Sequence, residues 1–158
     1  MNAFTYIDSP IGRLLLHSDG TALSGLYMDS GHPPRGMETW IEDRNAQPFP
    51  EAIRQLGEYF AGRRRVFDLP WRLHGTEFQQ RVWNALLEIP YGETWSYGEL
   101  ARRLGNPNAS RAVGLANGRN PISILVPCHR VIGADGSLTG YGGGLERKRW
   151  LLAHEGLH

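Results

Sequence analysis

The residues best suited to chemistry surround the single cysteine, Cys128, in the run Pro127-Cys128-His129-Arg130-Val131. A thiolate is a strong nucleophile, and a neighbouring histidine is a base that can take the thiol proton. Glu155, near the C-terminus, can orient that imidazole, which completes a set of nucleophile, base and orienting residue. The pattern indicates an activated cysteine, and the alternative is a small buried thiol without chemistry.

The backbone at Cys128 decides whether the two side chains can cooperate. In a regular strand the side chains of neighbouring residues point to opposite faces, which would separate Cys128 from His129. Cooperation therefore requires a turn at this point or a water molecule that bridges the two groups. In either arrangement, His129 and a nearby dipole are expected to lower the pKa of the thiol.

Composition limits the other kinds of site. One cysteine allows no intramolecular disulfide and no cysteine-rich zinc site. Among the histidines, His154 and His158 form a close pair, but this terminal pair lacks further ligands, so we expect no catalytic metal and no cofactor. The glycine-rich segment 140–144 lacks the Gly-Lys-Ser/Thr element of a phosphate loop. We expect it to form a lid, with Tyr141 as an aromatic wall.

The composition is that of a globular protein outside the membrane. The 158 residues are 41% hydrophobic and 21% charged, which supports a packed core and argues against global disorder. No apolar run approaches the roughly 20 residues of a membrane helix, and the N-terminus lacks the features of a signal peptide. We therefore expect a cytoplasmic protein in a reducing compartment.

The first half of the chain has the pattern of a small α/β unit. Turn signals at 9–12 and 19–20 separate short β-prone runs, and residues 30–50 are rich in glycine and proline, as in a loop. We expect strands at 4–8, 13–18, 22–28 and 63–71 and a helix at 51–60.

The second half, from residue 75 onward, has helical patterning. Thr76 and Gln79 have the spacing of a capping box, and Ser96 and Glu99 repeat it at the start of a second helix. Two short helices joined by a glycine-containing turn have the outline of a helix-turn-helix. We expect helices at 76–89, 96–104, 108–118 and 145–154 and a β-like run at 122–126.

This change of pattern predicts two domains, residues 1–74 and 75–158. Their net charges are −1 and +2, respectively. The asymmetry is weaker than the basic face that most nucleic-acid-binding domains carry. Charge alone therefore leaves the partner undefined.

Arg111 lies near the start of the expected helix 108–118, among small residues that allow a close approach. Such a helix either packs tightly within its own domain or lies against a nucleic-acid backbone. In the second case, Arg111 would enter the base stack in place of an extruded nucleotide. Tyr97, early in the preceding helix, would then contact a phosphate or the edge of the base.

At this point the sequence resembles a known family, the O6-alkylguanine-DNA alkyltransferases of the bacterial branch. The run 127–131 is similar to their active-site signature, and the resemblance is dense over residues 75–156 and general over residues 1–74. The other matching motifs are Phe78-Gln79-Gln80-Arg81-Val82-Trp83, Ile89-Pro90-Tyr91-Gly92-Glu93-Thr94, Ser96-Tyr97, Arg111-Ala112-Val113-Gly114, Asn117-Gly118-Arg119-Asn120-Pro121, Leu138-Thr139-Gly140-Tyr141 and the tail 143–156.

The resemblance implies a small N-terminal α/β (ribonuclease H-like) domain and a mainly helical C-terminal domain of the winged-helix/helix-turn-helix type. It implies that Cys128 accepts the alkyl group, that His129 deprotonates it through a water molecule, and that Glu155 orients His129. Asn120 would bridge the turn before the active-site segment. Some family members bind a structural zinc in the N-terminal domain, and this chain lacks the cysteines for it.

The resemblance also implies a set of residues that meet DNA. Tyr97 would help to rotate the nucleotide and donate a proton to the departing guanine oxygen, and Arg111 would fill the gap in the duplex. Val131 and Tyr141 would line the base pocket. Further DNA contacts are expected at Gln79, Gly98, Asn106 and Ala134. The helix-turn-helix of this family lies in the minor groove, which carries little base code and suits sequence-independent repair.

The implied function is DNA repair by direct reversal. O6-alkylguanine, and also O4-alkylthymine, would be flipped out of double-stranded DNA, and the alkyl group would move irreversibly to Cys128. A monomer that can cluster on DNA is expected. Two alternatives are a binding module that recognises the lesion without reacting, in which a tryptophan usually replaces the cysteine, and a cysteine hydrolase, which requires turnover and an oxyanion hole.

Overall fold

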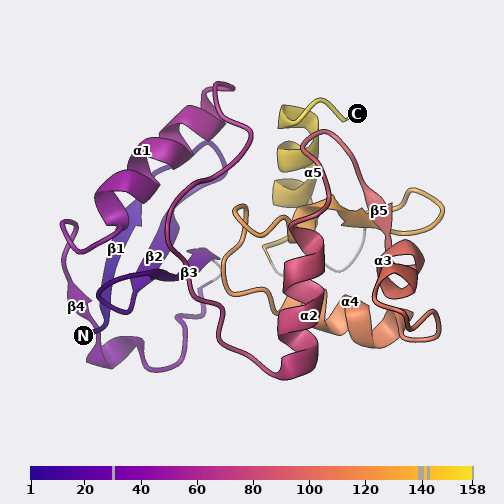
Figure 1. Ribbon diagram of the computed structural model, residues 1–158. Coiled ribbons are helices and arrows are strands. Elements are labelled where there is room, and N and C mark those ends of the chain that lie inside the picture. Colours follow the sequence, from indigo (N-terminus) through magenta and orange to yellow (C-terminus); the bar gives the residue numbers. More distant parts are fainter. Residues whose placement is uncertain (30, 139–140, 142, 158) are drawn as a thin grey trace. The chain divides into compact units, whose positions relative to one another are not determined.

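The computed structural model describes residues 1–29, 31–138, 141 and 143–157. The chain forms two compact units, residues 1–73 and 74–158 (Figure 1). Across the described ranges, no helix is both long and apolar enough to cross a bilayer.

The first unit is built on a four-stranded sheet. Its strands are β1 (Ala3–Ile7), β2 (Leu14–Ser18), β3 (Leu23–Met28) and β4 (Ile41–Glu42), in the order β3-β2-β1-β4. The first three strands are antiparallel neighbours, and β4 adds to β1 in parallel. The expected strands at 4–8, 13–18 and 22–28 are thus present within one residue at each end, and β4 and a short 3₁₀ turn, η1 (Met37–Thr39), lie in the region expected to be loop.

This sheet and one helix, α1 (Phe49–Phe60), supply the core of the first unit (Figure 1). Alternate residues of β1 are buried, as the period of a strand requires. On α1, Phe49, Leu56 and Tyr59 are almost fully buried, because they share one face of the helix. The helix starts two residues earlier than expected, with Pro50 in its first turn, where the missing amide hydrogen is tolerated.

The expected strand at 63–71 is wrong. Its end makes a single bridge, between Leu23 and Trp71, in which the amide of Leu23 donates to the carbonyl of Pro70 and the amide of Arg72, just beyond the segment, donates to the carbonyl of Leu23. The side chain of Gln55 donates to the carbonyl of Asp68 and accepts from its amide, and Pro70 has no amide hydrogen to donate to a ladder. The backbone of Asp68 therefore bonds a side chain where a strand would form a ladder.

In its described residues, the second unit contains four helices and a short parallel pair of strands (Figure 1). The elements are α2 (Glu77–Leu86), β5 (Trp95–Ser96), α3 (Tyr97–Arg103), α4 (Ser110–Gly118), the 3₁₀ turn η2 (Cys128–Arg130), β6 (Val131–Ile132) and α5 (Leu145–His154). Strand β5 pairs with β6. α5 has the expected bounds, whereas α2 ends three residues early and α4 begins two residues late.

Local capping explains where α2 and α3 begin. The Thr76 hydroxyl accepts from the amide of Gln79 at 3.1 Å, and the Gln79 side chain accepts from the amide of Thr76 at 3.0 Å, so the predicted capping box is confirmed. At α3 only half of the box forms. Ser96 accepts from the amide of Glu99, but the Glu99 carboxylate binds two arginines, Arg102 and Arg103.

The expected β-like run at 122–126 is wrong as well. The backbone of Ile124 has φ of 75°, which a β-branched residue rarely adopts, and the amide of Leu125 bonds the carbonyl of Ser123 only two residues back. The Asn120 side chain accepts from the amide of Ile122 and donates to the carbonyl of Val126. These bonds fold the segment into tight turns that deliver the chain to Cys128.

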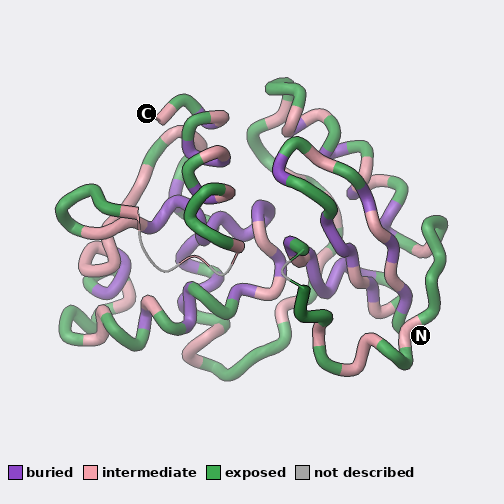
Figure 2. Tube along the Cα trace, turned by 180° about the vertical axis from the view of Figure 1, so that it is seen from behind, coloured by how far each residue is buried: buried purple, intermediate pink, exposed green. Residues whose placement is uncertain are grey.

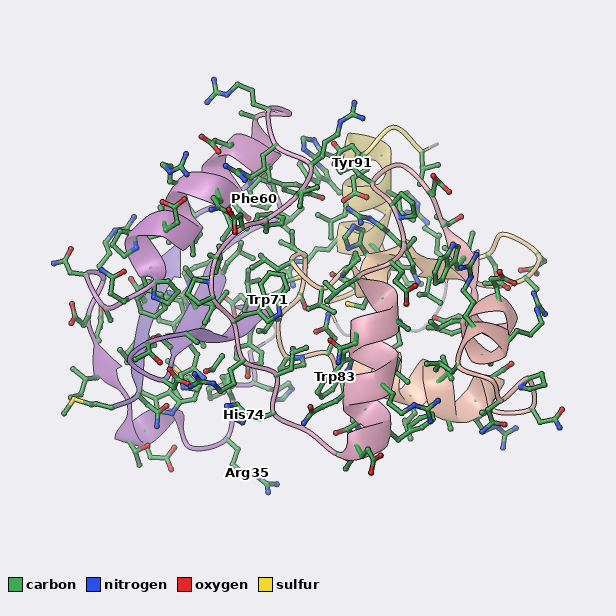
Figure 3. All side chains as sticks on the ribbon, viewed as in Figure 1. Arg35, Phe60, Trp71, His74, Trp83 and Tyr91 are labelled. Atoms are coloured by element: carbon green, nitrogen blue, oxygen red, sulfur yellow. The ribbon has the colours of Figure 1, made fainter. Side chains whose placement is uncertain are left out.

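Helix α2 is bonded to the helix-turn-helix through its tryptophan. The indole of Trp83 donates to the carbonyl of Ala116 at 2.9 Å and ties α2 to the last turn of α4 (Figure 3). The Tyr91 hydroxyl donates to the carbonyl of His154 at 3.4 Å and ties the turn after α2 to the end of α5 (Figure 3). Residues 124–131, which lead into η2 and pass through it, are all buried (Figure 2).

Candidate active site

Cys128 lies in the short turn η2, directly after Pro127, and is 4% exposed. The chain turns here, as cooperation between neighbouring side chains requires, because the amide of Arg130 bonds the carbonyl of Pro127. The thiol and the imidazole of His129 therefore leave a curved backbone and not a flat strand.

His129 is completely buried, and its Nε2 atom lies 2.8 Å from Oε2 of Glu155 at the end of α5. The same carboxylate also receives Arg130, whose Nε lies 2.8 Å from Oε1 and whose Nη2 lies 3.1 Å from Oε2. The remaining guanidinium nitrogen donates to the carbonyl of Ile89 at 2.8 Å. One carboxylate thus holds two consecutive residues of the active-site turn.

The charges of this group follow from its surroundings. Burial works to raise the pKa of Glu155, but hydrogen bonds and charge from His129 and Arg130 hold it at about 2. The carboxylate is therefore ionised, so the His129 Nε2 carries a hydrogen and donates it. Burial lowers the pKa of His129, and the Glu155 charge opposes that shift only in part. The imidazole is a neutral base with Nδ1 as its acceptor.

The expected lowering of the Cys128 pKa is wrong for this structure. Burial raises the pKa of the thiol, and a hydrogen bond from Asn120, the charge of Lys148 and a hydrogen bond from Ser123 oppose the rise without cancelling it. The turn η2 has three residues, too few for a helix dipole of consequence. The resting pair is thus a neutral thiol and a neutral imidazole.

Lys148 of α5 is a buried cation beside this pair. Its ammonium donates to the carbonyl of Val131 at 2.5 Å. Burial lowers the pKa of Lys148 to about 8, and the charge of a Cys128 thiolate works in the opposite direction. The charged form of Lys148 is therefore stabilised most when the Cys128 thiol is deprotonated.

The two expected base-pocket residues, Val131 and Tyr141, both follow Cys128 in the sequence. Val131 is fully buried at the start of β6. Burial and the nearby Cys128 raise the pKa of the Tyr141 hydroxyl well above its ordinary value, with Ser123 acting against that rise. Of the expected lid, residues 140 and 142 lie outside the described residues, as does His158 of the histidine pair.

Tyr97 and Arg111 lie on the two helices of the helix-turn-helix. Tyr97 is the first residue of α3, and its ring covers Gly114 of α4, where a methyl group would stand 3.5 Å from the ring carbons. Arg111 is the second residue of α4 and is exposed. The guanidinium of Arg111 therefore lies at the surface, and the ring of Tyr97 contacts α4, the helix that carries Arg111.

The remaining expected DNA contacts are spread over two helices and two turns. Asn106 is exposed in the turn between α3 and α4, and its carbonyl accepts from the amide of Ala109. Gly98 is half-buried in α3, and Ala134 is exposed in the turn after β6. Gln79 is half-buried, and its side-chain oxygen is committed to the capping box of α2.

Three buried polar residues near Cys128 were not expected: Arg130, Lys148 and Asn117. Two of them carried a signal in the sequence, because a polar residue in an apolar helical stripe needs a buried partner. Lys148 shares its stripe with Leu151 and Leu152, and Asn117 shares one with Val113. Among the described residues, no group of three or more His, Cys, Asp or Glu could hold a metal ion.

Comparison with known families matches both units. Residues 2–73 match the model described as 6-O-methylguanine DNA methyltransferase, ribonuclease-like domain. Residues 77–157 match the model described as 6-O-methylguanine DNA methyltransferase, DNA binding domain. Together these matches span nearly the whole chain and agree with the expected α/β and helical halves.

Individual relatives are similar along their whole length. The methylated-DNA–protein-cysteine methyltransferase of Mycolicibacterium paratuberculosis is 55% identical over 100% of this chain and 94% of its own. The protein of the same name from Methanosarcina acetivorans is 54% identical over 97% of both chains. The crystal structure of Mycobacterium tuberculosis OGT in complex with DNA has a TM-score of 0.90 and 56% identity, and covers 97% of this chain and 92% of that one.

Proposed function

The chain belongs to the 6-O-methylguanine DNA methyltransferase family, and we propose that Cys128 is the residue that accepts the alkyl group in its repair reaction. The activity is direct reversal of DNA alkylation by transfer of the alkyl group to a protein cysteine. Cys128 is the only cysteine in the sequence. The observation that carries the assignment is its position beside a buried neutral imidazole that an ionised carboxylate holds from behind.

The reaction begins with a proton transfer within this site. The thiol proton passes through a water molecule to Nδ1 of His129, and the electron pair stays on sulfur. The imidazolium that forms is stabilised by the Glu155 carboxylate at 2.8 Å. Both partners are neutral at rest, so the two charges form only during the transfer. The buried ammonium of Lys148 then stabilises the thiolate.

The thiolate then displaces the alkyl group in one step. Sulfur attacks the alkyl carbon, a carbon–sulfur bond forms, and the carbon–oxygen bond breaks with its electron pair moving to O6 of guanine. A proton from Tyr97 neutralises the departing oxygen. The product is a thioether, which none of these groups can hydrolyse, so each molecule reacts once. O4-alkylthymine offers the same kind of alkyl–oxygen bond.

The base must leave the duplex before the reaction, because the alkyl carbon is inaccessible within the stack. Arg111 on α4 takes the place of the flipped nucleotide, with Tyr97 rotating the nucleotide, and Val131 and Tyr141 hold the base. Gln79, Gly98, Asn106 and Ala134 contact the DNA around it. Support comes from the exposed position of Arg111 at the start of a helix rich in small residues.

DNA is the partner of this protein, as it is in the related Mycobacterium tuberculosis complex. We propose in addition that the chain acts as a monomer, that several molecules can cluster on one duplex, and that it works in the cytoplasm. Sedimentation of the protein with and without a long duplex tests the first two statements.

The decisive experiment measures the intact mass of the protein after incubation with a duplex that contains one O6-methylguanine. We expect the mass to increase by one methyl group in place of one hydrogen, on Cys128, with one transfer per molecule. The Cys128→Ser variant is the matched control and should keep its mass. Tight binding without a mass change would instead support a non-reacting module, and repeated turnover would support a hydrolase.

A further inference from the structure

Asn117 has a buried side-chain amide and no role in the reaction proposed above. It lies in the last turn of α4 and is 1% exposed. Its Nδ2 atom donates to the carbonyl of Cys128 at 3.3 Å. Its Oδ1 atom is buried and accepts no hydrogen bond from any described residue. One end of the amide therefore touches the active-site turn, and the other end has unused acceptor capacity.

His129, the residue after Cys128, also has a buried acceptor without a donor. Its Nε2 donates to Glu155, so Nδ1 has a lone pair and no hydrogen. Nδ1 is also buried, and within the described part of the chain it has no hydrogen-bond partner. Two buried acceptors without a donor, one amide oxygen and one ring nitrogen, thus belong to a residue that bonds the Cys128 carbonyl and to the residue that follows Cys128.

Two buried acceptors cannot satisfy each other, because neither has a hydrogen to give. A water molecule has two hydrogens to donate and a lone pair with which to accept, and buried waters typically make about three hydrogen bonds to such groups. The thiol of Cys128 supplies the third partner, since S–H is a donor. The donor and acceptor numbers of the three groups therefore match those of one water.

We propose that Asn117 is a positioning residue for alkyl transfer, which holds the water that carries the proton from Cys128 to His129. The water donates one hydrogen to Oδ1 of Asn117 and the other to Nδ1 of His129, and its oxygen accepts from the thiol. This inference rests on the proposed role of Cys128 and adds the group that fixes the water.

The proton transfer balances within this arrangement. The S–H bond breaks and its electron pair stays on sulfur, the water oxygen gains that proton, and the water hydrogen aimed at Nδ1 passes to the imidazole. The water is regenerated, and the products are a thiolate and an imidazolium. An amide oxygen is far less basic than an imidazole, so Asn117 orients the water without competing for the proton.

The test uses the full-length protein and the rate at which iodoacetamide alkylates Cys128 as a function of pH. This probe requires no DNA, so a failure of the proposed repair reaction and a failure of this inference are distinguishable. Asn117→Leu removes both ends of the amide at similar size. Asn117→Asp keeps an oxygen acceptor and, when ionised, loses the donor to the Cys128 carbonyl.

We expect Asn117→Leu to lower the alkylation rate about tenfold near neutral pH, as the loss of one hydrogen bond predicts. At alkaline pH the thiol ionises without the relay, so the rate should return to that of the original protein. Asn117→Asp should stay within about threefold of the original protein. In a His129→Phe background, Asn117→Leu should have no further effect.

An equal loss at every pH, an equal loss in both variants, or an undiminished effect in the His129→Phe background would each overturn the proposal. A crystal structure of the unmodified protein at high resolution gives a test that needs no variant. It should contain one water within hydrogen-bond distance of both Asn117 Oδ1 and His129 Nδ1. A site without that water, or a water that contacts only one of the two atoms, would also overturn it.

Discussion

The carboxylate of Glu155 lies 2.8 Å from the imidazole of His129, and both side chains are shut off from solvent. Because Arg130 binds the same carboxylate, Glu155 remains ionised and fixes the hydrogen of His129 on Nε2. Nδ1 is then left as the acceptor on the side of the ring that serves the thiol. Both the stability and the chemistry of the C-terminal unit depend on this pair.

Replacement of Glu155 by glutamine should strongly destabilise the protein. The Arg130 guanidinium would stay buried without its counter-charge, and removal of one partner of a buried pair costs about 3–5 kcal/mol. The free energy of unfolding from a denaturant titration measures the loss. Glu58→Gln is a matched control, because Glu58 pairs with Arg54 and Arg64 at the surface, and about 0–1 kcal/mol is expected there. Equal losses at both positions would contradict this account.

The stability of the protein should fall in acid partly through Glu155. Its pKa is about 2 in the folded protein and 4.5 ordinarily, so the folded state binds the proton less readily than the unfolded state. The stabilisation is therefore complete above pH 4.5 and is lost as the pH falls toward 2. Unfolding free energies over this range should decline more steeply for the original protein than for Glu155→Gln. Parallel curves would show that Glu155 is not responsible.

Replacement of Arg111 by alanine should impair repair of duplex DNA far more than reaction with free O6-benzylguanine. The free base needs no flipping, so it does not need a side chain that fills the stack. Arg111 is exposed, and the variant should fold normally. Arg119→Ala, at the other end of α4 and also exposed, is the control for a general loss of positive charge. Equal losses on both substrates would remove the proposed role of Arg111.

Replacement of Tyr97 by phenylalanine should slow alkyl transfer and leave the thiol itself unaffected. The hydroxyl is proposed to protonate the departing guanine oxygen, and the ring should keep its contact with Gly114. General acid catalysis of this kind contributes about 10²–10⁴-fold. Single-turnover transfer from O6-methylguanine DNA gives the loss, and iodoacetamide alkylation of Cys128 gives the control. A parallel fall in both rates would assign Tyr97 to thiol activation.

Replacement of Thr76 by alanine should destabilise the protein by about 1 kcal/mol, because it removes the cap of α2. Ser96→Ala at α3 should cost about the same, because each substitution removes one hydroxyl that accepts from a backbone amide, and the bond from the Thr76 amide to the Gln79 side chain survives in Thr76→Ala. Thermal unfolding of the two variants side by side measures both losses. A much larger loss for Thr76→Ala would show that the Gln79 bond depends on the Thr76 hydroxyl.

The helices were predictable where a local signal marks their start. The capping box at Thr76 depends on two residues three positions apart, so neighbouring residues suffice to define the start of α2. The three antiparallel strands were predictable for a related reason, because each is a short β-prone run bounded by local turn signals at 9–12 and 19–20. The two wrong strands, 63–71 and 122–126, failed because side chains of Gln55 and Asn120 satisfy their backbone groups.

The sequence by itself determined the reactive residue and its base, because Cys128 and His129 are neighbours and the motif around them is local. Tertiary structure alone decided their protonation. Glu155 reaches His129 from 26 residues away, Lys148 approaches from α5 and Asn117 from α4. Burial then raises the pKa of the thiol, contrary to the prediction from its neighbours, because the cost of desolvating a charge depends on everything packed around it.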